Sequence, residues 1–179
     1  MTGNMFIVLE GIDGTGKSTI SKELATRLGA QYYRCPRRIL MPLRKITDIC
    51  PYFIKYLYYL LGNYIAQKEI RALHKQSSVV CDWYVFSTLA YHSVLLNKQL
   101  RIPTILMPDK LVYLYATTEQ IRKRLNARNV QNKFEDLDFL ELVKHNYEKL
   151  LEHHPNVIRI DTTNIPVDIT VNELLQKIE

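Results

Sequence analysis

A glycine-rich segment near the N-terminus has residue types and spacing suited to binding phosphate. Gly11-Ile12-Asp13-Gly14-Thr15-Gly16-Lys17-Ser18 matches the pattern GxxxxGK[ST] without a mismatch. Glycines let backbone N–H groups turn inward around phosphate oxygens, and the helix that follows adds its dipole. We expect Lys17 to reach the β- and γ-phosphates of a nucleotide and Ser18 to hold Mg²⁺. The residues predicted to bind the nucleotide are Gly11, Ile12, Asp13, Gly14, Thr15, Gly16, Lys17, Ser18 and Thr19.

Two carboxylates are candidates for metal binding or catalysis beside this loop. Asp82 ends a second apolar run, and ligands of parallel α/β sheets gather at the carboxyl ends of strands. We expect Asp82 to orient the hydration shell of Mg²⁺; the alternative is that it caps the helix after Tyr84. Asp13 lies inside the loop, where a carboxylate is unfavourable unless it meets a metal, a hydroxyl or a cation. Its alternative is to point into solvent.

Basic residues gather on and after one predicted helix. Phosphoryl transfer needs positive charge on the equatorial oxygens of its transition state, and a mobile basic lid supplies it. The alternative is a solvated charged face. The residues concerned are Arg122, Lys123, Arg124, Arg128 and Lys133.

The elements that must position these residues alternate between short apolar runs and longer amphipathic segments. This alternation predicts an α/β fold. Without repeats or a linker, residues 1–179 are expected to form one domain, with a lid at about 124–135. The predicted strands are Met5–Leu9, Ala30–Tyr33, Ser78–Asp82, Leu111–Ala116 and Asn156–Ile160. The predicted helices are Lys17–Leu28, Tyr52–His74 with Gly62-Asn63 as a weak point, Phe86–Leu96, Glu119–Arg128 after a Thr117-Thr118 cap, Phe134–His153 and Val167–Ile178.

Composition narrows the class of protein. The 179 residues carry 24 Lys and Arg against 18 Asp and Glu, a net charge of +6 that suits a polyanionic partner. The three cysteines form no CxxC pair, which favours reduced thiols. We find no targeting segment and no apolar run long enough to span a bilayer, so we expect a cytoplasmic protein without a membrane partner.

Chain length and motif content select among proteins with such a loop. A base-reading NKxD-like segment is not present in the sequence, which argues against a signalling GTPase, and large motor or AAA-type ATPases need more chain. The chain therefore reads as a small nucleotide or nucleoside kinase.

Three segments resemble the thymidylate kinase family in order along nearly the whole chain. Residues 6–19, FIVLEGIDGTGKST, resemble the family's opening, and Asp82-Trp83-Tyr84-Val85-Phe86-Ser87-Thr88-Leu89-Ala90-Tyr91 resembles its DRYxxSxxAY segment. Arg124-Leu125 with Arg128, followed by Phe139, Val143, Tyr147 and Leu150, resembles its lid and the next helix. The middle of the chain resembles one branch, the thymidylate-kinase-like mitochondrial UMP-CMP kinase, through Leu43-Arg44-Lys45, Leu61-Gly62-Asn63-Tyr64-Ile65 and Glu69-Ile70.

The resemblance implies a P-loop NTPase three-layer sandwich with a five-stranded parallel sheet, often assembled as a homodimer. It implies transfer of the ATP γ-phosphoryl, with Mg²⁺, to a pyrimidine nucleoside or deoxynucleoside monophosphate such as dTMP, UMP or CMP. The implied catalytic residues are Asp13, Lys17, Asp82 and Arg128, with Arg124 beside the ATP and the loop after Asp161 bordering its adenine. The implied acceptor residues are Arg44 for its phosphate, Tyr58 for its base, and Asn63, Trp83 and Tyr91.

Departures from the family pattern keep other functions open. Trp83 replaces the family's Arg, which removes a fixed charge from the acceptor side. Gly62-Asn63 stand where thymidylate kinases carry a base-reading Arg, and Cys35-Pro36 replace their Glu-Pro. The alternatives are a deoxynucleoside kinase, whose acceptor lacks a phosphate, and an ATP-binding protein that has lost kinase activity. Nucleic-acid binding is the weakest, because no nucleic-acid-reading motif accompanies the positive charge.

Overall fold

A five-stranded parallel sheet forms the centre of the molecule. The computed structural model describes residues 3–35, 49–127, 136–152, 154 and 156–178. The strands are β1 (Phe6–Glu10), β2 (Gln31–Arg34), β3 (Val79–Asp82), β4 (Lys110–Tyr115) and β5 (Val157–Asp161). They lie in the order β2-β3-β1-β4-β5, and every neighbouring pair is parallel. The predicted α/β class and five-stranded parallel sheet are confirmed.

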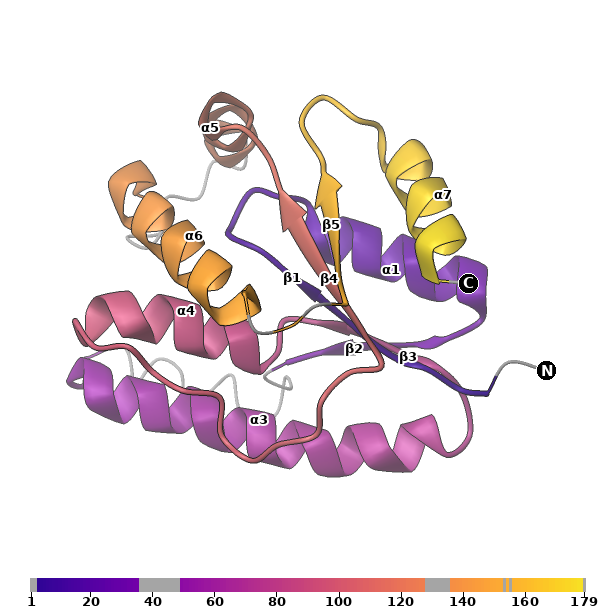
Figure 1. Cartoon of the computed structure of the whole chain (residues 1–179), viewed down its shortest axis with the longest axis horizontal. Coiled ribbons are helices and arrows are strands. Elements are labelled where there is room, and N and C mark those ends of the chain that lie inside the picture. Colours follow the sequence, from indigo (N-terminus) through magenta and orange to yellow (C-terminus); the bar gives the residue numbers. More distant parts are fainter. Residues whose placement is uncertain (1–2, 36–48, 128–135, 153, 155, 179) are drawn as a thin grey trace.

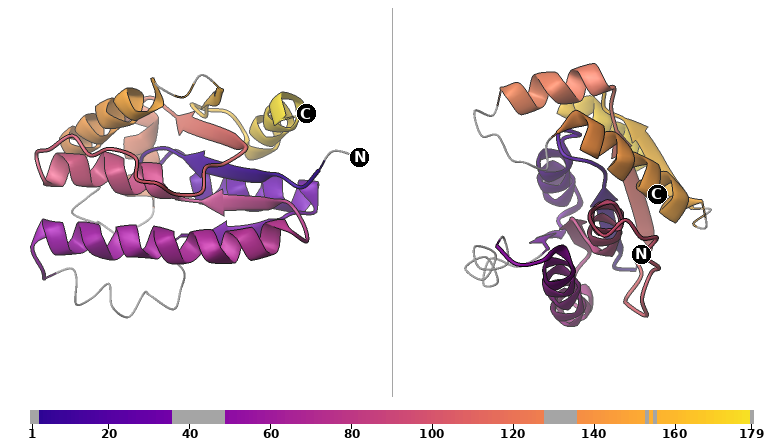
Figure 2. Two further views of the ribbon diagram at one scale, coloured as in Figure 1. Left: turned by 60° about the horizontal axis from the view of Figure 1, so that its bottom comes forward. Right: turned by 90° about the vertical axis from the view of Figure 1, so that its left-hand side faces the viewer.

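Helices cover both faces of the sheet and complete a three-layer sandwich (Figure 1). In the described part of the chain they are α1 (Lys17–Leu28), α3 (Tyr52–His74), α4 (Val85–Leu95), α5 (Thr118–Asn126), α6 (Leu137–Leu151) and α7 (Val167–Ile178). Helices α3, α4 and α6 lie on one side of the sheet, and α1 and α7 lie on the other (Figure 2). Helix α5 sits beyond the carboxyl end of β4.

The sequence of β1 explains this two-sided packing. All five of its residues are buried, as expected of a central parallel strand. Phe6 and Val8 join the apolar cluster under α3, α4 and α6, whereas Ile7 and Leu9 join the cluster under α1 and α7. Each such side chain stabilises the fold by roughly 1.5–3 kcal/mol through burial, so β1 is fixed in register against both layers.

Most predicted bounds lie within two residues of the observed ones, and the differences have local causes. Thr117 caps α5 as predicted, because its hydroxyl accepts a hydrogen bond from the Gln120 amide at 3.4 Å. The predicted weak point at Gly62-Asn63 is wrong: α3 continues through both residues, which are buried against the molecule. The three cysteines are free, as expected. None of the described helices is both long and apolar enough to cross a membrane.

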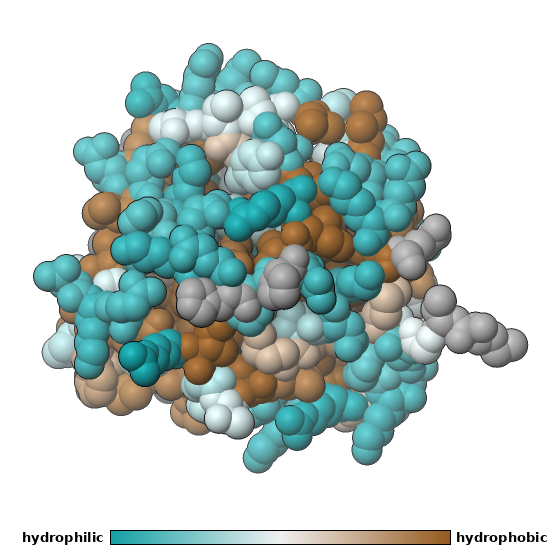
Figure 3. Space-filling view, in the orientation of Figure 1, coloured by the Kyte–Doolittle hydropathy of each residue, from teal (hydrophilic) through white to brown (hydrophobic). Residues whose placement is uncertain are grey.

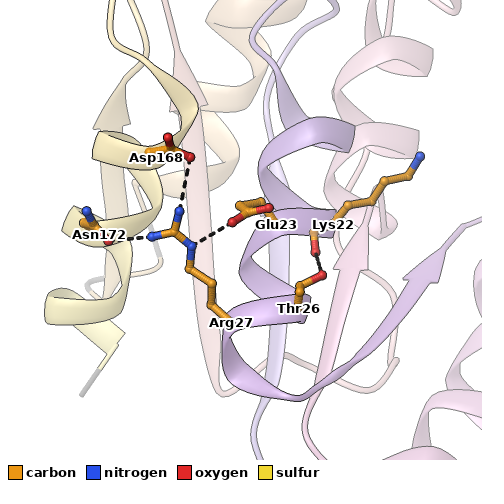
Figure 4. A network of polar contacts seen from close by, with 6 residues as sticks. All are labelled: Lys22, Glu23, Thr26, Arg27, Asp168 and Asn172. Carbon is orange, nitrogen blue, oxygen red and sulfur yellow. Dashed lines mark hydrogen bonds and ion pairs between the residues drawn. The ribbon is translucent and has the colours of Figure 1, made fainter.

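A polar network ties α7 to α1 (Figure 4). The guanidinium of Arg27 donates to Glu23 at 2.8 Å within α1, and reaches α7 through Asp168 at 3.2 Å and Asn172 at 2.6 Å. Exposed ion pairs of this kind add little stability. The contacts instead join the last turn of α1 to the first turns of α7.

Candidate functional site

The glycine-rich loop lies where the strand order of the sheet reverses. It leaves the carboxyl end of β1, which pairs with β3 on one side and β4 on the other, and it leads into α1. Ligands of open α/β sheets bind at such a switch point. A Cβ atom at Gly11 would lie 2.3 Å from the Leu114 carbonyl oxygen, and at Gly14 it would lie 3.0 Å from Ile121 Cγ2. Both glycines also have positive φ, so the loop can pass close to β4 and α5 only with these residues.

The side chain of Lys17 is turned into the loop. Its ammonium donates a 2.7 Å hydrogen bond to the Ile12 carbonyl and lies 4.7 Å from the centre of the Trp83 ring. Lys17 is only 4% exposed, although it opens a helix whose next residues, Ser18 and Thr19, are half-buried and exposed. The Lys17 ammonium is therefore buried and held against the backbone of the loop at Ile12.

A pocket of about 300 Å³ adjoins the loop between α5 and the segment after β5. Arg124 spans it, donating to the Gly14 carbonyl at 3.1 Å and to the Thr162 carbonyl at 2.6 Å. Both the predicted nucleotide residue Arg124 and the loop after Asp161 thus lie beside the phosphate loop. The lining residues are Gly14, Thr15, Gly16, Thr19, Ile20, Arg124, Ala127, Thr162, Ile165, Val167 and Thr170.

Asp82 is a fully buried carboxylate at the end of β3, paired in the sheet with Leu9. Its Oδ2 accepts a 3.0 Å hydrogen bond from the Tyr32 hydroxyl, whereas Oδ1 has no hydrogen-bond partner among the residues that the structure describes. The capping alternative is wrong, because the α4 N-cap is Tyr84 and its amide donates to Glu10 instead. A buried carboxylate oxygen that lacks a donor fits a cation, so Asp82 suits the predicted Mg²⁺ site together with the Ser18 hydroxyl.

Asp13 is held by Tyr91 of α4. The Tyr91 hydroxyl accepts from the Asp13 amide at 3.0 Å and donates to the Asp13 carboxylate at 3.1 Å. Burial and the adjacent Asp13 carboxylate raise the pKa of Tyr91, so its hydroxyl keeps its proton. Asp13 is therefore half-buried and held in place by Tyr91, so the alternative that it points into solvent is wrong.

The predicted acceptor residues on α3 lie inside the molecule. Asn63 is 1% exposed; its amide donates to Thr88 of α4 at 2.8 Å, and its oxygen accepts from the Cys35 thiol at 3.1 Å. Tyr58 is also buried, with its ring 5.1 Å from that of Tyr59. In this structure Asn63 joins α3 to α4 and to the end of β2, and its contact with an acceptor stays a prediction.

Two further predicted residues lie outside the described part of the chain. They are Arg44, predicted to hold the acceptor phosphate, and Arg128, predicted to act from the lid; Lys133 and most of the predicted lid at 124–135 also lie there.

Glu10 is a site residue that sequence reasoning missed. It is fully buried directly before the loop, where its carboxylate accepts from the Ser87 hydroxyl, the Tyr147 hydroxyl at 3.0 Å and the Tyr84 amide at 3.0 Å. Burial raises its pKa to about 7, although hydrogen bonds from Ser87 and Tyr147 and the charge of Lys17 oppose the shift. The Tyr147 hydroxyl also lies 3.3 Å from the Gly11 carbonyl, so this network joins α4 and α6 to the loop. The only sequence signal is a charged residue ending an otherwise apolar strand.

Comparisons with known proteins identify the family of this chain. The family model described as thymidylate kinase matches residues 9–174. A probable thymidylate kinase of Methanocaldococcus jannaschii is 35% identical, with 98% of this chain and 96% of that protein covered. A thymidylate kinase of Coprothermobacter proteolyticus is 30% identical, with 98% and 99% covered.

Solved structures show the same fold. The Candida albicans thymidylate kinase aligns with a TM-score of 0.82 at 19% identity, covering 98% of this chain and 91% of that one. A deoxyadenosine kinase from M. mycoides with bound dATP aligns with a TM-score of 0.74 at 18% identity, covering 96% of this chain and 98% of that one. The match to the family model and to relatives along nearly the full chain shows that this protein belongs to the thymidylate kinase family and is an ATP-dependent nucleoside monophosphate kinase.

Proposed function

We propose that the protein transfers the γ-phosphoryl group of ATP to dTMP. The observation that carries the proposal is the complete phosphate loop, closed around a buried Lys17, in a chain that matches named thymidylate kinases along nearly its full length. UMP and CMP, which the middle segments suggested, gain no support from these relatives.

The chain's own residues divide the work of binding and orientation. Amides of the loop and the start of α1 bind the phosphates, and Lys17 serves the β- and γ-phosphates. Asp13, fixed by Tyr91, faces the acceptor sugar, while Arg44 and Tyr58 bind the acceptor's phosphate and base. Phosphoryl transfer needs little covalent chemistry from the protein, so positioning and charge account for the rate.

Mg²⁺ belongs to this proposal because two oxygen donors suit it. The Ser18 hydroxyl stands at the start of α1, and Asp82 offers a buried carboxylate oxygen without a donor among the described residues. When bound, the metal neutralises charge that develops on the phosphate oxygens. Replacing Asp82 by Asn should raise the Mg²⁺ concentration needed for half-maximal turnover, measured by titrating Mg²⁺ at saturating ATP.

Arg128 is proposed to stabilise the transition state from a lid at about 124–135. Thr15 occupies the loop position where some family members carry an Arg, so the lid must supply that charge here. Arg128→Ala should therefore lower kcat far more than the affinity for ATP. An equal loss in both quantities would remove Arg128 from this role.

The residue at position 83 keeps two other functions open, a deoxynucleoside kinase and a protein that only binds ATP. Trp83 stands where the family has an Arg, and its ring lies beside Lys17 rather than offering a cation to the acceptor. A deoxynucleoside kinase needs no such cation, and neither does a protein that only binds ATP. Activity that appears only in Trp83→Arg would favour the ATP-binding protein.

A homodimer is proposed from the family resemblance. It is supported by exposed apolar side chains on the first turns of α3, where Figure 3 shows hydrophobic surface at its lower left. These residues are Tyr52, Phe53, Ile54, Leu57 and Leu61. Sedimentation should give twice the monomer mass, and Leu57→Glu with Leu61→Glu should give the monomer; a monomeric parent protein would contradict the dimer.

The acceptor is tested by ADP release from Mg-ATP with a panel of acceptors. The panel contains dTMP, UMP, CMP, dUMP, dCMP, GMP and AMP, with the matching nucleosides alongside. The proposal predicts that dTMP gives the highest kcat/KM. Turnover of nucleosides alone would move the assignment to a deoxynucleoside kinase, and ATP binding without turnover would move it to an ATP-binding protein.

A further inference from the structure

Trp83 is held in a backbone conformation that bulky residues rarely adopt. Its φ is +69°, in the left-handed region, and it joins the end of β3 to α4. Its amide donates to the Leu9 carbonyl at 3.4 Å, and its own carbonyl accepts from the Cys81 thiol at 3.1 Å. A strained residue persists where its surroundings fix it, and such residues cluster at functional sites.

The indole of Trp83 contacts the phosphate loop at Lys17 and reaches Asp13 of the loop through Tyr91. Its ring lies 4.7 Å from the Lys17 ammonium and 5.4 Å from the centre of the Tyr91 ring, and Tyr91 holds the amide and carboxylate of Asp13. One side chain from the β3–α4 junction thus supports the loop directly at its single lysine and, through Tyr91, at its single carboxylate.

The contact with Lys17 is of the kind that gains strength from burial. A cation within about 6 Å of an indole centre is attracted by the negative face of the ring, most strongly when water is kept away. Lys17 is 4% exposed, and its 2.7 Å hydrogen bond to the Ile12 carbonyl turns the ammonium into the loop. An Arg at position 83 would instead place a second cation near this ammonium and repel it.

We propose that Trp83 is a positioning residue that holds the Lys17 ammonium inside the phosphate loop through its indole face, ready for the β- and γ-phosphates. This inference rests on the proposed role of Lys17 in phosphate binding. Trp83, which replaces the family's Arg, would then act on the ATP side of the site, separately from any contact with the acceptor.

The test compares ligands that reach Lys17 with one that does not. We expect Trp83→Leu to weaken ATP and ADP binding by roughly 5- to 30-fold, and Trp83→Phe to weaken it less, because phenylalanine keeps a smaller aromatic face. Adenosine has no phosphate for Lys17, so its affinity should not change. ATP and ADP affinities come from calorimetry and adenosine affinity from ligand-observed NMR, and none of them requires an acceptor or turnover.

A double-mutant cycle separates positioning from a general structural role. If Trp83 acts through Lys17, then Trp83→Leu should weaken ATP binding no further in a Lys17→Met background. Because Trp83 is the only tryptophan, its fluorescence reports the same contact, and Lys17→Met should shift the emission of the nucleotide-free protein. Circular dichroism and thermal melting show whether each variant is folded. If Trp83→Leu does not fold, the cycle is measured with Trp83→Phe.

The outcomes are distinct from failure of the dTMP assignment. Three results together support positioning, whichever acceptor the enzyme uses. Affinity is lost for ATP and ADP only, the loss is larger in Trp83→Leu than in Trp83→Phe, and Trp83→Leu causes no further loss in the Lys17→Met background. Unchanged ATP affinity, an equal loss of adenosine binding, or losses that add in the double variant would each overturn it.

Discussion

Glu10 makes the stability of this protein depend on pH in an unusual direction. Its carboxyl has a pKa of about 7 in the folded protein, against 4.5 when unperturbed, chiefly because it is buried. The folded state therefore holds the proton more tightly than the unfolded chain. The resulting stabilisation is full below about pH 4.5 and is lost as pH rises through 7, by about 3 kcal/mol in total.

Glu10→Gln removes this titration while preserving the hydrogen bonds. The glutamine carbonyl can accept from the Tyr84 amide, and its amide group can donate to the hydroxyl oxygens of Ser87 and Tyr147. The free energy of unfolding, measured by urea denaturation from pH 5 to 8, should therefore fall less steeply with pH in the variant than in the parent protein. The difference between the two curves should change by roughly 2.5 kcal/mol over this range, because the rest of the total is lost below pH 5.

His92 is the reason for using a difference curve. Burial lowers its pKa to about 4 from 6.5, so it makes stability rise with pH over that interval, opposite in sign to Glu10. Both proteins keep His92, and its contribution cancels in the difference. Glu173→Gln, at an exposed carboxylate paired with Lys177, controls for the lost negative charge. Parallel curves for Glu10→Gln and the parent would refute the assignment of a raised pKa to Glu10.

Three further substitutions test the loop and its supports. Gly11→Ala should lower the free energy of unfolding by roughly 2–4 kcal/mol, measured by urea denaturation, because the Cβ would meet the Leu114 carbonyl. Tyr91→Phe frees the Asp13 carboxylate and leaves its amide unbonded, so steady-state kinetics should show kcat falling more than ATP affinity. Arg124→Ala should weaken ATP binding roughly 10-fold in calorimetry, because it removes charge-assisted bonds that shape the pocket.

Each of these substitutions has a matched control. Gly3 has open space around it, Tyr115 is partly exposed on β4, and Arg122 is exposed on α5. We expect Gly3→Ala, Tyr115→Phe and Arg122→Ala to stay close to the parent protein. Equal effects in a substitution and its control would contradict the corresponding role.

The sequence predicted the sheet and the phosphate loop because both depend on local patterns. The apolar run of β1 and the spacing from Gly11 to Ser18 each specify their structure within a few residues. Helix ends marked by a clear cap were also predicted, as at Thr117. Where one residue type fits two roles, the sequence left both open, as it did for Asp82 as metal ligand or helix cap.

The contacts that sequence reasoning missed join residues far apart in the chain. Glu10 binds Ser87 and Tyr147, which are 77 and 137 positions away, and no local pattern pairs them. A weak point in the helix at Asn63 was predicted from local sequence alone, whereas the hydrogen-bond partners of Asn63 lie on α4 and after β2. Such pairings follow from packing of the layers, which only the three-dimensional structure provides.

Formation of dTDP from dTMP and Mg-ATP tests the central claim most directly. Phosphorus NMR of the reaction should show the dTMP signal replaced by the two signals of dTDP while ATP is converted to ADP. Lys17→Met should abolish both changes. ADP formation without dTDP, or unchanged dTMP beside a phosphorylated nucleoside, would contradict the assignment of dTMP as the acceptor.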